Sequence, residues 1–253
     1  MASLARIISS LAVGGKKSPF CSAVIVAAGD SKRMGGEDKV FIEICGAPLL
    51  AHTLMAFQAV DGVGEIVVVA RESCLERVGG ICKDYGIDKA TRIIAGGPTR
   101  MASVTSGVYA ASKKADLIAI HDGARPCVSR ADIEPALGAA VKFHAAAPGI
   151  EVSSTIKRAK GGVITETIDR YGLIEIQTPQ VFAAEIIKAA LVNARKKSIE
   201  VTDDCQAAEL IGAFARITEG SHSNIKVTTI EDLAIAKAIL RDRGAADYWR
   251  EVQ

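Results

Sequence analysis

Short apolar runs rich in β-branched residues alternate along the chain with longer stretches rich in alanine and leucine. The runs cover residues 23–28, 65–70, 92–95 and 117–121, and each is followed by a stretch long enough for a helix. Strands that alternate with helices in this way indicate a parallel sheet with helices on both faces. We therefore predict an α/β fold with a doubly wound, mostly parallel sheet.

The size of the chain permits a large core, and its charge favours no macromolecular partner. It has 253 residues, 49% of them hydrophobic, and 31 basic against 29 acidic residues leave a net charge of +2. A balanced charge without long runs of one sign argues against nucleic-acid binding. No apolar run approaches the roughly 20 residues that cross a bilayer. We expect neither nucleic acid nor membrane as a partner.

The cysteines and the first residues bear on location and domain organisation. No C-x-x-C pair occurs among Cys21, Cys45, Cys74, Cys82, Cys127 and Cys205. That spacing indicates reduced thiols, and we expect a cytoplasmic protein. Residues 1–20 contain three cations and no acid, but their apolar stretch is interrupted by two serines. We interpret 1–20 as an N-terminal extension and 21–253 as one domain, and an organellar address stays open.

The alternation of strands and helices lapses between residues 150 and 172. Two β-rich stretches, 151–158 and 162–168, flank a turn at 159–162. This pattern predicts a hairpin arm that projects from the domain. Beyond it we expect a strand at 178–182, helices over 183–196 and from Thr202, a strand at 225–228 and a terminal helix whose first turn carries Thr229, Glu231 and Asp232.

A glycine-rich turn at residues 27–36 follows the first predicted strand. Ala28 and Gly29 would let backbone N–H groups approach a phosphate, and Arg33 and Lys39 would neutralise its charge. The turn lacks both the P-loop and the dinucleotide glycine pattern, which argues against an ATPase or a dehydrogenase. Taken alone it also fits a tight turn with a solvated pair of cations. With the loops that follow, it suggests a polyphosphate site.

Two further predicted strands end in polar loops. Gly96 and Gly97 would expose backbone to a base edge and Ser103 adds a hydroxyl, although a helix start with a glycine hinge has the same pattern. Asp122 follows the next strand, where a carboxylate beside a triphosphate is placed to hold Mg²⁺. Its simpler interpretation is an aspartate that pairs with Arg125 in the loop. Strand ends meet at one edge of such a sheet, where ligands bind.

Six segments resemble, in the same order, motifs of the 2-C-methyl-D-erythritol 4-phosphate cytidylyltransferases. They lie at 27–39, 96–104 (GGPTRMASV), 121–126 (HDGARP), 178–180 (TPQ), 202–204 (TDD) and 224–228 (NIKVT), and the resemblance extends over about residues 21–241. It implies a Rossmann-like nucleotidyltransferase fold. It also implies transfer of the cytidylyl group of CTP to 2-C-methyl-D-erythritol 4-phosphate with release of pyrophosphate, in non-mevalonate isoprenoid precursor synthesis with Mg²⁺.

The resemblance also implies roles for individual residues. Catalytic roles fall to Arg33, Lys39 and Lys226, and Asp122 would hold the metal. Substrate contacts fall to Ala28, Gly29, Gly96, Gly97, Ser103, Gly123, Arg125, Thr155, Arg170, Thr178 and Thr202. The arm would build a homodimer in which Thr155 and Arg170 reach the sugar phosphate in the neighbouring subunit's site.

Three positions depart from the family pattern: Ser31 replaces a glycine, Asp38 a proline and Val40 a glutamine. They leave the conformation of the first loop open. Ribitol 5-phosphate is the alternative acceptor, because the CTP half of such an enzyme would look nearly the same. A glycosyltransferase that uses a nucleotide sugar would be expected to carry a D-x-D motif, which does not occur here. A nucleotide-binding regulator is the third possibility.

Overall fold

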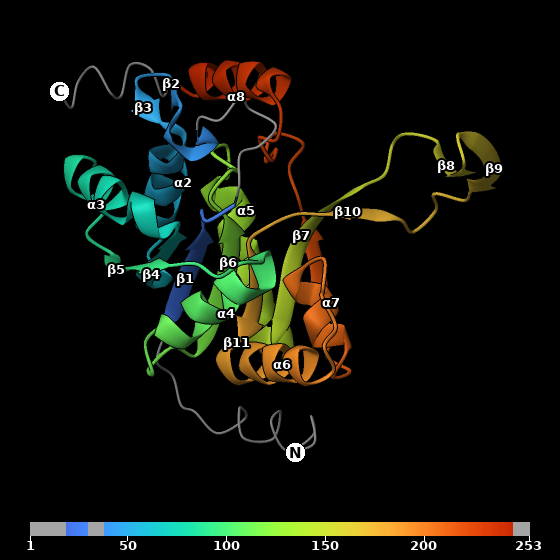
Figure 1. The fold of residues 1–253 in the computed structure, drawn as a ribbon, viewed down its shortest axis with the longest axis horizontal. Coiled ribbons are helices and arrows are strands. Elements are labelled where there is room, and N and C mark those ends of the chain that lie inside the picture. The colour runs from blue at the N-terminus through green and yellow to red at the C-terminus, as the bar shows by residue number, and fades with distance from the viewer. Residues whose placement is uncertain (1–18, 30–37, 245–253) are drawn as a thin grey trace.

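A computed structural model describes residues 19–29 and 38–244, and it confirms the α/β prediction. One mixed sheet forms the centre, in the order β10-β7-β11-β6-β1-β4-β5, with β12 paired to β7 (Figure 1). Its strands are β1 (Cys21–Val26), β4 (Val63–Ala70), β5 (Ala90–Ala95), β6 (Leu117–Asp122), β7 (Ala145–Glu151), β10 (Ile174–Ile176), β11 (Gln180–Ala183) and β12 (Arg216–Glu219). The four strands expected first in the sequence are all present and mutually parallel.

Helices cover both faces of this sheet. They are α2 (Leu49–Gln58), α3 (Leu75–Asp84), α4 (Arg100–Ala110), α5 (Arg130–Phe143), α6 (Ala184–Lys196), α7 (Asp204–Glu209) and α8 (Ile230–Asp242), with short 3-10 helices η2 (Lys39–Phe41) and η3 (Glu72–Cys74) and a small hairpin of β2 (Glu43–Ile44) and β3 (Ala47–Pro48). Alternate residues of β1 point to opposite faces, so Ala23 and Ile25 pack with α2 and α5 while Val24 packs with α4 and α6. The two-residue period of the strands therefore builds two separate cores.

The carboxyl ends of β1, β4, β5 and β6 lie at one edge of the sheet, and α4 starts close to it. Gly107 allows α4 to approach the sheet, because a Cβ there would lie 2.3 Å from Val24 Cγ1 and 2.8 Å from Val69 Cγ2. The helix starts at Arg100 after Thr99, whose hydroxyl accepts a hydrogen bond from the Ala102 N–H. The loops after β1, β5 and β6 are thereby gathered at this edge.

The arm is present as a hairpin of β8 (Ile156–Lys160) and β9 (Val163–Ile168) that extends away from the sheet (Figure 1). Its turn uses Gly161 and Gly162, both with positive φ (58° and 79°), which glycine adopts without steric cost. The predicted first strand at 151–158 is wrong in its start, because Glu151 ends β7 in the main sheet. The hairpin prediction is confirmed, and its role in dimerisation stays a prediction.

Two other predictions are wrong. No strand forms at 225–228 in the described chain, because this segment bonds to the loop after β6, with Val227 N–H donating to Ala124 O at 2.8 Å. The helix expected from Thr202 starts at Asp204, since the Asp203 carboxylate accepts from the Gln206 N–H and is the N-cap. In the described part of the chain, every helix is too short or too polar to cross a bilayer.

Candidate active site

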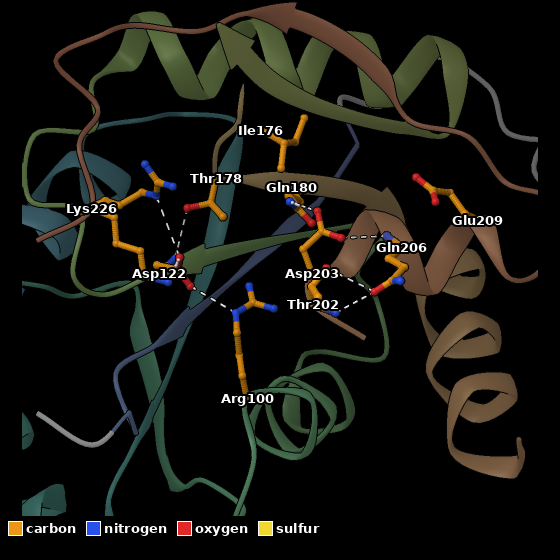
Figure 2. A pocket seen from close by; sticks show the side chains of 11 residues that line it. Arg100, Asp122, Ile176, Thr178, Gln180, Thr202, Asp203, Gln206, Glu209 and Lys226 are labelled. Carbon is orange, nitrogen blue, oxygen red and sulfur yellow. Dashed lines mark hydrogen bonds and ion pairs between the residues drawn. The ribbon is translucent and has the colours of Figure 1, made fainter. Parts of the chain in front are cut away.

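Two cavities meet at the carboxyl edge of the sheet. The strand-end pocket, about 550 Å³, is lined by Val26, Ala27, Ala28, Gly29, Lys39, Val40, Arg71, Gly97, Pro98, Thr99, Arg100, Ser103, Asp122, Ala124, Lys226 and Thr228. The α7 pocket, about 520 Å³, is lined by Arg100, Asp122, Arg125, Ile176, Thr178, Gln180, Thr202, Asp203, Gln206, Glu209 and Lys226 (Figure 2). Arg100, Asp122 and Lys226 belong to both linings. A group that passes between the two cavities must pass these side chains.

Asp122 is the acidic centre of this junction. Its side chain is 11% exposed, and its carboxylate lies 2.8 Å from Lys226 Nζ and 3.3 Å from Arg100 Nε. Arg125 Nε lies 3.9 Å from Asp122 Oδ2, the same oxygen that Lys226 contacts. Burial alone would raise the pKa of Asp122, but Arg100 and Lys226 lower it far below its usual range. The carboxylate is therefore ionised whenever the protein is folded near neutral pH.

Arg100 is a site residue that the sequence analysis did not assign. Its Nη2 donates to Asp204 Oδ2 at 2.8 Å, and the Asp204 side chain is only 1% exposed. Gln180 Oε1 accepts from the backbone N–H groups of Asp204 and Cys205, both at 2.9 Å, which fixes the start of α7. The sequence signal that could have identified Arg100 was its position in the GGPTR segment at 96–100. Its carboxylate partners come from distant segments and were not visible in the sequence.

The two predicted phosphate lysines that the structure describes converge from separate segments. Lys39 lies on η2 and donates from Nζ to Val227 O at 2.8 Å. Lys226 directly precedes Val227 in the chain, and its Nζ contacts the Asp122 carboxylate. Both lysines line the strand-end pocket. Arg33, the third predicted catalytic cation, lies outside the described residues.

Ser103 lines the strand-end pocket at the wall after β5, and Gly96 shapes the same wall without lining it. Ser103 is 2% exposed, its Oγ accepts from Gly97 N–H at 3.1 Å, and it donates to Thr99 O at 3.0 Å. Gly96 is absent from the lining, but a Cβ there would lie 2.5 Å from the Ala28 Cβ. Glycine therefore lets the loops after β1 and β5 touch. Gly97, Ala28 and Gly29 line the pocket as predicted.

Thr178, Arg125 and Thr202, which the sequence analysis assigned to substrate contacts, line the α7 pocket. The Thr178 hydroxyl accepts from Asp122 N–H at 3.2 Å and lies 2.9 Å from His121 Nδ1. Arg125 Nη1 donates to a backbone carbonyl, Asn224 O, at 2.5 Å.

Besides Gly96, three predicted substrate residues lie outside both linings. Gly123 belongs to the core, where its N–H donates to Val26 O and its carbonyl accepts from Thr53. Thr155 and Arg170 belong to the arm, and neither lines either of these two cavities. The assignment of these residues to substrate binding stays a prediction, as does that of the residues that line the two cavities.

Asp122 is also the predicted metal ligand. The described residues contain no group of three or more histidine, cysteine, aspartate or glutamate side chains that would enclose an ion. Mg²⁺ takes few protein ligands and fills its remaining positions with water and substrate phosphate oxygens. Asp122 is the acidic residue common to both linings, and one ionised carboxylate at this junction suits an ion held mainly by a bound triphosphate, so these residues fit magnesium.

Comparisons with known proteins agree with this geometry. The family described as IspD, 2-C-methyl-D-erythritol 4-phosphate cytidylyltransferase, matches residues 21–242. Proteins of that name from Halalkalibacterium halodurans and Dehalococcoides mccartyi are 43% and 40% identical over 223 and 220 residues. These alignments cover 88% and 87% of this chain and 97% and 95% of the relatives.

Solved structures show the same likeness. The 4-diphosphocytidyl-2C-methyl-D-erythritol synthase of Anaerococcus prevotii superposes with a TM-score of 0.78 at 29% identity, covering 88% of this chain and 97% of the other. The 2-C-methyl-D-erythritol 4-phosphate cytidylyltransferase of Thermus thermophilus gives a TM-score of 0.73 at 31% identity, covering 86% and 98%. The family match spans most of the domain, and the relatives match nearly end to end. The chain belongs to the 2-C-methyl-D-erythritol 4-phosphate cytidylyltransferase family.

Proposed function

We propose that this protein transfers the cytidylyl group of CTP to 2-C-methyl-D-erythritol 4-phosphate and releases pyrophosphate, with Mg²⁺ as cofactor. Family membership supports the reaction. The observation that carries the mechanism is the junction of Arg100, Asp122 and Lys226 between two cavities. A two-substrate transfer needs such a junction, because the two reacting phosphates must meet.

In the proposed reaction CTP occupies the strand-end pocket and the acceptor phosphate enters from the α7 pocket. An acceptor phosphate oxygen forms a bond to the α-phosphorus, and the bond from that phosphorus to the β-phosphate oxygen breaks. A phosphate monoester is already largely ionised at pH 7, so no general base is needed. The protein's task is to orient two anions and neutralise their charge.

Cationic side chains are assigned to this neutralisation. Lys39 and Lys226 would contact the triphosphate, and Arg33 would join them. Asp122 and the phosphates would hold Mg²⁺, which supplies charge neutralisation at the phosphate oxygens. Arg100 lies on the wall that both cavities share, where it would contact the transferred group.

We also propose a homodimer in which the arm of one subunit completes the acceptor site of its partner. Thr155 and Arg170 would then contact the sugar phosphate across the interface. Their absence from the linings of the strand-end pocket and the α7 pocket of their own chain supports this assignment. Unpaired strand edges and exposed apolar side chains on the arm, among them Val163 at 65% and Ile164 at 64% exposure, favour a covering partner.

An assay of pyrophosphate release tests this function. The protein is given CTP and Mg²⁺ together with either methylerythritol phosphate or ribitol 5-phosphate as acceptor. We expect turnover with the first, since the family match favours it over ribitol phosphate. Lys39→Ala should lower kcat/KM by about 100-fold or more, the loss typical of a charge-stabilising group. Lys188→Ala, which removes a lysine paired with Glu185 on α6, is the matched control. Near-normal turnover of Lys39→Ala would contradict the assignment.

A cytoplasmic location is our proposal for the protein in the cell. Its support is six free cysteines, which suit a reducing compartment. Residues 1–18 lie outside the described chain. A fusion of residues 1–20 to a fluorescent protein tests for an organellar address, and import into an organelle would contradict the proposal.

A further inference from the structure

Arg71 lines the strand-end pocket but has no role in the reaction as described so far. It directly follows β4, whose carboxyl end lies between those of β1 and β5. It therefore stands at the ligand-binding edge, in the same lining as Gly29 and Lys39. Its side chain is 38% exposed.

The partner of Arg71 is Asp38, one of the three residues that depart from the family pattern. Arg71 Nη2 donates to Asp38 Oδ2, and Cys74 Sγ lies 3.6 Å from the same oxygen. The Asp38 side chain is only 6% exposed. An ionised carboxylate buried to this degree needs a cationic or hydrogen-bonding partner, so the pair ties the segment before η2 to the end of β4.

This tie acts on the residue that follows. Asp38 has an extended backbone (φ −75°, ψ 106°), and its carbonyl accepts from the Phe41 N–H at 2.9 Å at the start of η2. Lys39 is the first residue of η2, and its Nζ is held at the other end by Val227 O. Lys39 is thus fixed both through the backbone of Asp38 and through its own side chain.

We propose that Asp38 and Arg71 are positioning residues that hold Lys39 against the triphosphate. The proposal rests on the function proposed above for the strand-end pocket. The backbone geometry adds a specific consequence. A φ of −75° lies within the range that a proline ring imposes, so proline at position 38 would hold the same backbone without the ion pair. Asp38 and Arg71 then achieve with a salt bridge what a ring achieves covalently.

The test measures CTP binding by calorimetry, without acceptor, together with the KM for CTP during turnover. Asp38→Asn and Arg71→Gln should each weaken CTP binding about tenfold, and the double variant should be no weaker than either, as for two residues that act as one unit. In a Lys39→Ala background Asp38→Asn should add no further loss. Asp38→Pro should bind CTP within about twofold of wild type, also when combined with Arg71→Gln.

Controls separate this inference from its rivals. Arg130→Gln removes a surface arginine paired with Glu134 and should leave CTP binding unchanged. A loss in Arg71→Gln that Asp38→Pro does not repair would assign Arg71 to direct phosphate contact and overturn the proposal. Unchanged CTP binding in both single variants would also overturn it. Should Asp38→Asn fail to fold, the Asp38→Pro, Arg71→Gln pair still decides the question.

The same measurements distinguish failure of the proposed function. Wild-type protein that binds CTP but does not use methylerythritol phosphate would refute the reaction while leaving the positioning role intact. Full turnover of the wild type, with unchanged CTP binding in Asp38→Asn and Arg71→Gln, would support the reaction and refute the positioning role.

Discussion

At the level of single residues, the site depends on one carboxylate that neutralises several cations. Asp122 contacts Lys226 and Arg100, which come from segments far from it in the sequence. Arg100 also donates to a second carboxylate, that of Asp204, and would keep this partner if Asp122 held a metal ion. Replacing Asp122 therefore removes a candidate metal ligand and leaves the cations around it unbalanced.

Asp122→Asn tests the metal assignment. We expect kcat to fall about 100-fold or more and the Mg²⁺ concentration for half-maximal rate to rise, because the amide is a weak ligand for a hard cation. A magnesium titration of the initial rate measures both. An unchanged magnesium requirement would remove Asp122 from the metal site. Glu134→Gln, which removes a surface carboxylate paired with Arg130, is the control and should change neither value.

The cysteines provide a second residue-level prediction. Burial raises the pKa of Cys21 to about 12 and those of Cys82 and Cys127 to about 11. At pH 8 roughly one thiol in a thousand or fewer would be ionised at these positions, and the thiolate is the reactive form. Iodoacetamide should label none of the three in the folded protein and all of them in urea. Peptide mass spectrometry gives the result, and rapid labelling of folded Cys21 would contradict it.

At the level of elements, polar residues at helix ends decide where the chain turns. α8 starts at a capping box in which the Thr229 hydroxyl accepts from Asp232 N–H and the Asp232 carboxylate accepts from Thr229 N–H. The same carboxylate accepts from both the N–H and the hydroxyl of Thr228. This cap ends the segment that carries Lys226, so it links helix formation to the geometry of the pocket.

Asp232→Asn should lower the free energy of unfolding by about 1 kcal/mol at pH 7. Burial opposes ionisation, but hydrogen bonds from Thr228 and Thr229 lower the pKa of Asp232 below its value in the unfolded chain. Its contribution is therefore complete above the unfolded pKa and is lost as pH falls through the folded one. Urea unfolding at pH 7 and pH 3 should show a difference between variant and wild type that shrinks at pH 3. A constant difference would exclude an ionic contribution.

For the whole molecule, the sheet brings a buried histidine into the core behind the site. His121 is fully buried, its ring packs against Phe57 at 4.9 Å between centroids, and its Nδ1 faces Thr178. Burial lowers its pKa from 6.5 to about 3. Burial also lowers the pKa of His52, so both histidines make the folded protein less stable as the pH falls.

The sign of the pH effect follows from these pKa values. Between pH 6.5 and 3 the unfolded chain binds a proton at His121 that the folded protein excludes. The contribution of His121 to the free energy of unfolding is therefore complete above pH 6.5 and is lost as the pH falls below it. From pH 7.5 to 5 the loss should be about 2 kcal/mol. His121→Gln should lose less over this range, measured by urea unfolding. An equal loss in the variant would place the pH dependence elsewhere.

The proposed dimer gives a prediction for the assembly. Asp122→Asn and Arg170→Gln should each be nearly inactive alone, because the first lacks its own site and the second lacks the arm contact. After the two variants are unfolded and refolded together, half of the dimers are mixed and each holds one complete site, so about a quarter of wild-type activity should return. No recovery, with dimers present by light scattering, would place Arg170 in its own subunit's site.

Much of the fold was predictable from the sequence, because periodicity and turn chemistry are local. Three local signals each lie within a few neighbouring residues: the apolar β-branched runs of β1 and β4, the paired glycines of the arm turn and the cap of α8. The strand expected at 225–228 was wrong for the opposite reason: its β-branched residues resemble a strand, but among the described residues this segment bonds to the loop after β6 and not to a strand.

The sequence by itself determined the fold class, the three strand-end loops and the family, since each is expressed in contiguous residue patterns. Only the tertiary structure decided how the charges pair. Arg100 bonds to Asp204 across 104 positions, and Arg71 to Asp38 across 33. Such pairs depend on which strand ends the sheet places side by side, and short-range patterns carry no information about distances between remote segments. Asp38, which the sequence shows only as one of three departures from the family pattern, is in the tertiary structure the partner of Arg71 beside Lys39.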